Sequence, residues 1–118
     1  MTINEYLRKY RKVNEFGMSR TRPRVKCADG YSVSVQAGYG LYSHPRVDAD
    51  TYTHVELGFP SAEDYLLGGY AQDENRPLKT VYPFVPVDVV DALLARHGGI
   101  VEACMSNVSE GAWEGLAE

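Results

Sequence analysis

Apolar residues recur at helical spacing at the start of the chain, and basic residues fill the remaining positions. The apolar face of such a helix holds Ile3, Tyr6, Leu7, Tyr10 and Val13. Thr2 stands three residues before Glu5, which is the spacing of a capping box, in which each side chain accepts a hydrogen bond from the other residue's backbone N–H. The pattern therefore predicts a helix from Thr2 to Val13.

Two more helices are expected in the second half of the chain. Val87 to His97 has apolar residues at helical spacing, with Pro86 in the first turn and Gly98 placed to end the helix. Ser61 suits the N-cap of a shorter helix, which the glycine pair at 68 and 69 would end early.

Two other segments alternate apolar and polar residues, which is the pattern of a strand with one buried face. They are Tyr31 to Ala37 and Tyr52 to Phe59. Arg24 to Ala28 is expected to form a short strand before the first of them. Asp29-Gly30 then predicts a two-residue type I′ hairpin turn, because residues of these types adopt the positive φ that both central positions need.

Two further strands complete the expected sheet. Thr80 to Val85 is expected at an edge, because Pro83 has no backbone N–H to donate to a neighbouring strand. Ile100 to Met105 would be the last strand, and residues 106–118 are expected to form a loosely ordered tail. The order of elements favours a single α+β domain over residues 1–118. It would have a small, mostly antiparallel sheet of about four or five strands and about three helices packed on one face.

Composition points to an ordinary soluble domain. No apolar run approaches the roughly 18 residues that a membrane-spanning helix needs. The N-terminal residues lack the apolar stretch of a secretory signal. The two cysteines, Cys27 and Cys104, are too few for a disulfide scaffold. We therefore expect a cytoplasmic protein with no membrane partner.

The net charge of −4 combines two segments of opposite sign. Residues 1–26 hold eight basic and two acidic side chains, net +6, and the rest of the chain holds four basic and fourteen acidic ones, net −10. The basic segment would suit a phosphate-bearing ligand, or it would dock against the acidic remainder of its own or a neighbouring chain. A nucleic-acid duplex is not expected as the partner, because the field of the whole protein repels it.

Residue types used in catalysis are present, but their spacing matches no known pattern. The chain has no G-x-S-x-G elbow, and neither cysteine carries a catalytic signature. Gly38-Tyr39-Gly40 lacks the lysine and the helix start of a phosphate-binding loop. The potential metal ligands are His44, Asp48, Asp50 and His54. Their spacing fits neither zinc nor calcium sites. No catalytic residue, metal or cofactor is therefore predicted.

A binding surface is better supported. The polar residues of the two alternating strands share one face, and the loop between these strands adds aromatic and basic side chains. Tyrosine stacks on a base, arginine forks onto a phosphate, and amides or carboxylates bind base edges and ribose. The predicted ligand-binding residues are Ser34, Gln36, Tyr39, Tyr42, His44, Arg46, His54 and Glu56. The alternative is a solvated sheet face with routine cross-strand polar pairs.

Several segments resemble small uncharacterised proteins encoded by phages and prophages. They are residues 25–37, Tyr42-Ser43-His44-Pro45-Arg46, residues 55–61, and residues 81–87 together with His97-Gly98-Gly99. The resemblance spans roughly residues 1–101 and implies a small accessory protein of the host bacterial cytoplasm. Many such proteins counter host immunity. The resemblance carries no site residues.

The function expected from the polar face is that of a non-enzymatic anti-defence sponge, which binds and sequesters a nucleotide-derived immune signal. A chain of this size has little room to enclose a nucleotide, so a homo-oligomer is expected. Three alternatives stay open. One is a protein-binding inhibitor of a host defence effector, such as an anti-CRISPR protein, whose acidic surface would mimic nucleic acid. The others are a small nucleotide hydrolase, which would use His44 or His54 with Glu56, and a virion-associated protein.

Overall fold

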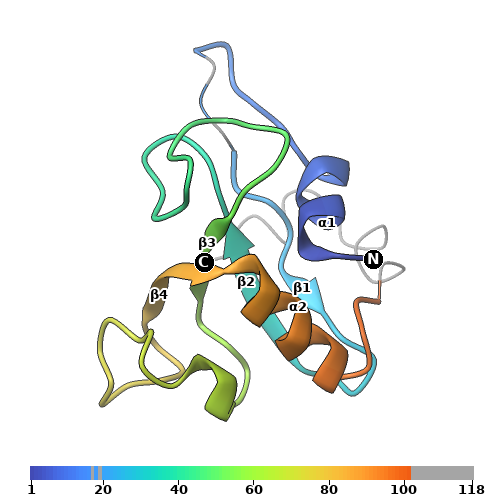
Figure 1. The fold of residues 1–118 in the computed structure, drawn as a ribbon, viewed down its shortest axis with the longest axis vertical. Helices are drawn as coiled ribbons and strands as arrows, with labels where there is room; N and C mark the ends of the chain where they lie inside the picture. The colour runs from blue at the N-terminus through green and yellow to red at the C-terminus, as the bar shows by residue number, and fades with distance from the viewer. Residues whose placement is uncertain (17, 19, 102–118) are drawn as a thin grey trace.

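The computed structural model describes residues 1–16, 18 and 20–101 (Figure 1). Its elements are helix α1 (Ile3–Lys9), strands β1 (Val25–Lys26), β2 (Ser32–Gln36) and β3 (His54–Gly58), the 3-10 helix η1 (Tyr65–Leu67), strand β4 (Val81–Pro86) and helix α2 (Val87–Arg96). The strands form one antiparallel sheet in the order β1-β2-β3-β4. The α+β class is confirmed. Among the described residues there are two α-helices, fewer than the three predicted.

Apolar side chains from both helices and from the strands form one core. Helix α1 contributes Ile3, Tyr6 and Leu7, the two central strands contribute Val33, Val35, Val55 and Leu57, and α2 contributes Val90, Leu93 and Leu94. The backbone N–H of Ile3 donates to the Asp91 carboxylate at 2.8 Å, which ties the start of α1 to α2. The predicted apolar faces of the two helices therefore pack in the core, except Val13, which lies beyond α1 and is exposed.

The capping box at the start of α1 is present as predicted. The Glu5 N–H donates to Thr2 Oγ1 at 3.2 Å, and the Thr2 N–H donates to a Glu5 carboxylate oxygen at 2.6 Å. The helix ends earlier than predicted, at Lys9 instead of Val13. The backbone beyond it turns back on itself, since the Arg20 N–H donates to the Lys12 carbonyl at 2.9 Å.

Replacing Thr2 with alanine is expected to lower the free energy of unfolding by about 1 kcal/mol, because the Glu5 N–H loses its partner. Urea denaturation measures the change. Thr2→Ser keeps the hydroxyl and is expected to match the wild type. An equal loss in both variants would contradict the capping role.

The β1–β2 hairpin forms where it was predicted, but its turn is not the expected two-residue type I′. The Gly30 N–H donates to the Cys27 carbonyl at 3.0 Å, and within the turn only Gly30 has positive φ, 98°. Asp29 keeps an ordinary φ, while its carboxylate accepts the Tyr31 N–H at 2.8 Å. The result is a three-residue loop with glycine in the left-handed position.

The helix predicted from Ser61 is replaced by the single 3-10 turn of η1, which Asp64 caps by accepting the Leu66 N–H at 2.9 Å. Ser61 is not available as a cap because it pairs with Ser32. The Ser61 N–H donates to the Ser32 carbonyl at 2.8 Å, and the Ser32 N–H donates to Ser61 Oγ at 2.9 Å. This pairing holds the segment after β3 beside the start of β2.

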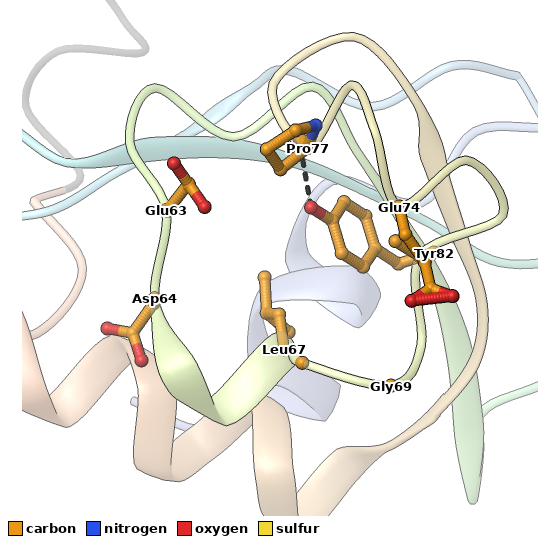
Figure 2. Close-up of a pocket in the computed structure, with 9 residues that line it drawn as sticks. Glu63, Asp64, Leu67, Gly69, Glu74, Pro77 and Tyr82 are labelled. Atoms are coloured by element: carbon orange, nitrogen blue, oxygen red, sulfur yellow. Dashed lines mark hydrogen bonds between the residues drawn. The ribbon is translucent and has the colours of Figure 1, made fainter.

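The loop between η1 and β4 encloses one side of a pocket of about 190 Å³ (Figure 2). Figure 2 shows Glu63 and Asp64 on one wall and Glu74 on the other, with Leu67 below. The Tyr82 hydroxyl donates to the Pro77 carbonyl at 2.6 Å and so holds the far wall. Sequence reasoning did not anticipate this acidic pocket.

Strand β4 lies at the edge of the sheet, as Pro83 predicted. Its pairing with β3 shifts register between Val55 and Leu57, opposite the Pro83-Phe84 region. At the other edge, Ile100 bridges Cys27, so part of the predicted last strand is seen. The remainder of that strand and the predicted tail at 106–118 lie outside the described residues. Neither helix of the described residues has the length and apolar character to cross a membrane.

Candidate functional site

The eight predicted ligand-binding residues separate into two groups. Six lie on the loop from Gly38 to Arg46 or on β3: Tyr39, Tyr42, His44, Arg46, His54 and Glu56. The other two, Ser34 and Gln36, are buried. The expectation that they are displayed on an open sheet face is therefore wrong.

Ser34 and Gln36 are covered by the segment that precedes β1. Gln36 Oε1 accepts the Arg22 N–H at 2.8 Å, and Gln36 Nε2 donates to the Arg22 carbonyl at 3.0 Å and to Ser34 Oγ at 3.1 Å. The side-chain amide thus pairs with the backbone of Arg22 as another strand would. Ser34 and Gln36 therefore bond within the fold and are not displayed to a ligand on the sheet face.

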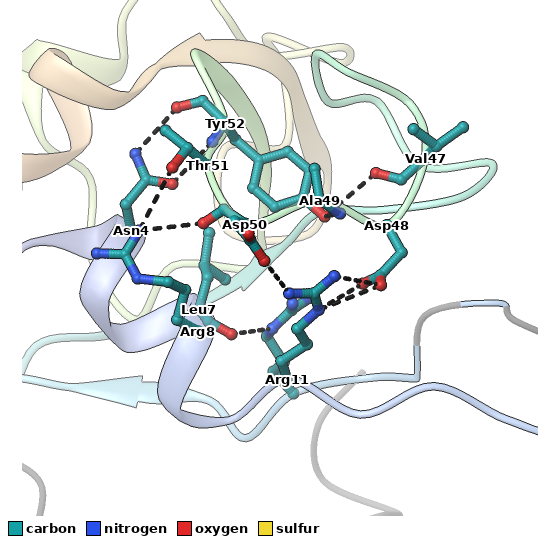
Figure 3. Close-up of polar contacts among 11 residues, drawn as sticks. Asn4, Leu7, Arg8, Arg11, Val47, Asp48, Ala49, Asp50, Thr51 and Tyr52 are labelled. Atoms are coloured by element: carbon teal, nitrogen blue, oxygen red, sulfur yellow. Dashed lines mark hydrogen bonds and ion pairs between the residues drawn. The ribbon is translucent and has the colours of Figure 1, made fainter.

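The basic N-terminal segment docks on the acidic part of its own chain, one of the two alternatives for its charge (Figure 3). Arg11 Nη2 lies 2.6 Å from an Asp48 carboxylate oxygen, and Arg11 also pairs with Asp50. Arg8 donates to the Asp50 carbonyl at 3.0 Å. The charge of Arg11 is therefore paired within the chain, and Arg8 is held by a backbone carbonyl beside it, so these two arginines are less available to a phosphate or a nucleic acid.

The loop from Gly38 to Arg46 is held in one shape by internal hydrogen bonds. Ser43 is buried, and its Oγ accepts the Gly38 N–H at 3.1 Å and donates to the Pro45 carbonyl at 2.8 Å. Arg46 Nε donates to the Leu41 carbonyl at 2.9 Å, and Arg46 Nη2 donates to the Gly40 carbonyl at 3.3 Å. The guanidinium of Arg46 is thereby fixed from one side.

Three exposed side chains form what we call the aromatic platform: Tyr42, Arg46 and Phe84. The rings of Tyr42 and Phe84 lie with centroids 5.7 Å apart, tilted by 54°. The Arg46 guanidinium lies over the Tyr42 ring, 5.4 Å from its centroid. The Phe84 N–H donates to the Tyr42 carbonyl at 3.1 Å, so the loop and β4 are joined at this point.

Phe84 is the member of the platform that sequence reasoning missed. Its φ is 52° and its side chain is 42% exposed. A bulky residue with positive φ is uncommon, and such strain costs of order 1–3 kcal/mol and gathers at functional sites. Phe59 has the same φ, but its side chain is partly buried. The strain at Phe84 instead presents an aromatic ring at the surface.

Arg46 and Arg96 both lie over a tyrosine ring, but they differ in whether a carboxylate pairs with the guanidinium. Arg96 lies over the Tyr65 ring at 4.6 Å and also pairs with the Asp64 carboxylate at 3.3 Å. No carboxylate of residues 1–16, 18 and 20–101 pairs with Arg46, and no described residue accepts a hydrogen bond from its Nη1. Arg46 therefore presents a cationic group over the Tyr42 ring, with Nη1 donors that bond no described residue.

The remaining predicted residues frame the platform. The Glu56 carboxylate accepts the Tyr42 N–H at 3.0 Å, so it positions the tyrosine. The His44 N–H donates to the His54 carbonyl at 2.9 Å, and their rings meet edge to face with centroids 6.3 Å apart. Tyr39 is exposed on the same loop.

Other candidate chemistry is less suited to a ligand of this kind. Burial, with a contribution from the charge of Asp29, raises the pKa of the Cys27 thiol to about 11, so it is not a ready nucleophile. Among the described residues, no three metal-ligating side chains gather in one place. The acidic pocket in Figure 2 would repel a phosphate, because Glu63, Asp64 and Glu74 line it.

Comparison with known proteins adds no family assignment: no protein-family model, curated protein or solved structure matches the chain.

Proposed function

We propose that the chain is a non-enzymatic binding protein that sequesters a nucleotide-derived ligand on the aromatic platform. A base would stack on Phe84 with the tilted Tyr42 ring at its edge, and a phosphate would bind Arg46. The observation that carries the proposal is the arrangement of Arg46, which two backbone carbonyls fix over Tyr42 while its Nη1 donors bond nothing among the described residues.

Base stacking, the charge of Arg46 and its fixed position all favour a nucleotide-derived ligand. Stacking of a base on an aromatic side chain contributes about 1–3 kcal/mol. A charge-assisted hydrogen bond from a guanidinium to a phosphate is roughly twice as strong as a neutral one. Because Arg46 is already held in place, little side-chain entropy is lost on binding. A neutral aromatic ligand would use the rings and leave the Arg46 charge without a partner.

The platform covers one side of a ligand only, so the proposal includes a second copy of the chain on the other side. In the cytoplasm of an infected bacterium, such an oligomer would withdraw a signalling nucleotide from a host defence system. We propose this role in countering host defence because several segments resemble phage and prophage proteins.

Native mass spectrometry of the protein with a panel of cyclic di- and trinucleotides and ADP-ribose derivatives tests the proposal. We expect a discrete oligomer that holds an intact nucleotide. Arg46→Ala is expected to weaken the affinity roughly 30-fold, the effect of losing a dominant contact. Arg96→Ala is the matched control, because it also removes an arginine stacked on tyrosine and is expected to bind normally.

Three results would overturn the proposal. Failure of every nucleotide to bind is the first. Equal affinities of the Arg46 and Arg96 variants would remove the proposed site. Cleavage of the bound nucleotide would show the hydrolase alternative instead.

A protein-binding inhibitor of a host effector is the second candidate, and one observation favours it. Tyrosine, phenylalanine and arginine exposed together are typical of the energetically dominant part of protein interfaces. If the protein is such an inhibitor, the wild type would bind no nucleotide of the panel and would retain a stoichiometric protein partner in a pull-down from bacterial lysate. The Phe84→Ser variant would lose that partner.

A further inference from the structure

His97, at the end of α2, lies between two carboxylates from distant parts of the chain. Its Nδ1 is 2.7 Å from an Asp29 oxygen in the β1–β2 turn, and its Nε2 is 2.9 Å from an Asp64 oxygen at the cap of η1. The Tyr31 ring stacks on the imidazole with centroids 3.9 Å apart and planes 9° from parallel. Three elements therefore meet at one side chain.

The geometry matches the charged form of the imidazole. An ionised carboxylate only accepts hydrogen bonds, and only the imidazolium carries an N–H on both ring nitrogens. A neutral imidazole would donate to one carboxylate and turn a lone pair toward the other. Loss of the proton therefore removes one of the two bonds and leaves a repulsive contact in its place.

The charged groups around His97 favour the imidazolium. They are Asp29 from the turn, Asp64 from the η1 loop, and the carbonyl end of α2, where a positive charge is favourable. Arg96 acts in the opposite sense through its pairing with Asp64. Burial lowers the pKa of His97, but the hydrogen bonds to Asp29 and Asp64 outweigh it and raise the pKa above its ordinary value.

We propose that His97 is a proton-operated clasp, which in its protonated form fastens both the β1–β2 turn and the η1 loop to the end of α2. Two pockets border this clasp. One, of about 270 Å³, is lined by Asp29, Tyr31, Ser61 and His97, and the acidic pocket begins at Asp64. Release of the clasp would loosen the walls of both. The inference is independent of the aromatic platform.

The direction of the pH dependence follows from the raised pKa of His97. A group with a higher pKa in the folded than in the unfolded state stabilises the fold fully below its unfolded value. That stabilisation is lost as the pH rises through the folded value. The clasp is therefore closed in mildly acidic solution and opens toward alkaline pH.

Hydrogen exchange of the whole chain at about pH 5.5 and about pH 8.5, corrected for intrinsic exchange rates, tests the clasp. In the wild type, protection of residues 28–32 and 61–67 is expected to fall roughly threefold or more at the higher pH, beyond any change in β3. His97→Gln is expected to show low protection at both pH values. His44→Gln is the control and should behave as the wild type.

Protection that does not change with pH in the wild type would overturn the proposal, as would a pH response kept by His97→Gln. If that variant does not fold, NMR of the wild-type imidazoles decides. We expect His97 to be protonated on both nitrogens at about pH 6.5. A neutral, single tautomer at that pH would contradict the clasp.

Discussion

Replacing Arg22 with alanine is expected to lower the free energy of unfolding by roughly 3 kcal/mol. Arg22 is only 1% exposed. Its Nε donates to the Leu7 carbonyl at 3.0 Å, and its Nη1 donates to the Ala37 carbonyl at 2.9 Å. The substitution leaves both carbonyls without these donors and opens a cavity between α1 and β2. For a domain of this size the melting temperature would fall by about 15 °C.

Thermal and urea denaturation measure this effect. Arg20→Ala is the matched control, because Arg20 lies two residues away and is exposed, so its loss is expected to cost less than about 0.5 kcal/mol. Arg22→Met fills most of the volume without the donors, and it separates the cavity from the lost hydrogen bonds. Equal stability of the Arg22 and Arg20 alanine variants would contradict the buried role of Arg22.

Gly98→Ala is expected to destabilise the protein by roughly 2–3 kcal/mol, and Gly99→Ala by about 1 kcal/mol. Both glycines have positive φ, 91° and 87°, so each substitution strains the backbone. They differ in the space around them. A Cβ at Gly98 would lie 2.8 Å from the Ala28 Cβ, whereas at Gly99 nothing lies within 4 Å. The difference isolates the contact between the end of α2 and the β1–β2 turn.

Urea denaturation of the two glycine variants side by side is the measurement. A larger loss for Gly98→Ala shows that the turn packs tightly against the end of α2. Equal losses, or a larger loss for Gly99→Ala, would contradict that packing.

The parts of the fold that were predictable are those set by local chemistry. The capping box of Thr2 and Glu5 joins residues three apart, so it predicted the start of α1 correctly. Pro83 lacks an N–H in any fold, so it predicted the edge position of β4 correctly. Ser61 was misassigned because its partner, Ser32, is distant in sequence and competes for the same hydroxyl. The turn at Asp29-Gly30 also departed from its local preference, because the Asp29 side chain bonds to Tyr31 and His97.

In the candidate site, too, features set by local residue types were predictable, and those set by contacts with distant segments were not. Residue types alone indicated the loop with Tyr42, His44 and Arg46, which the structure brings together with His54 and Glu56 on β3. Alternation in β2 could not reveal that a second layer of chain, at Arg22, covers Ser34 and Gln36. Phe84 could not be found because positive φ leaves no mark in the sequence of a phenylalanine.

The most direct test of the platform is an NMR titration of the ¹⁵N-labelled protein with the nucleotide that binds best in the mass-spectrometric panel. We expect the largest amide shifts at Gly40, Tyr42 and Phe84, because the Phe84 N–H bonds to the Tyr42 carbonyl beneath the proposed stacking surface. Shifts confined to the acidic pocket around Glu63 and Glu74, with the platform amides unmoved, would contradict the account.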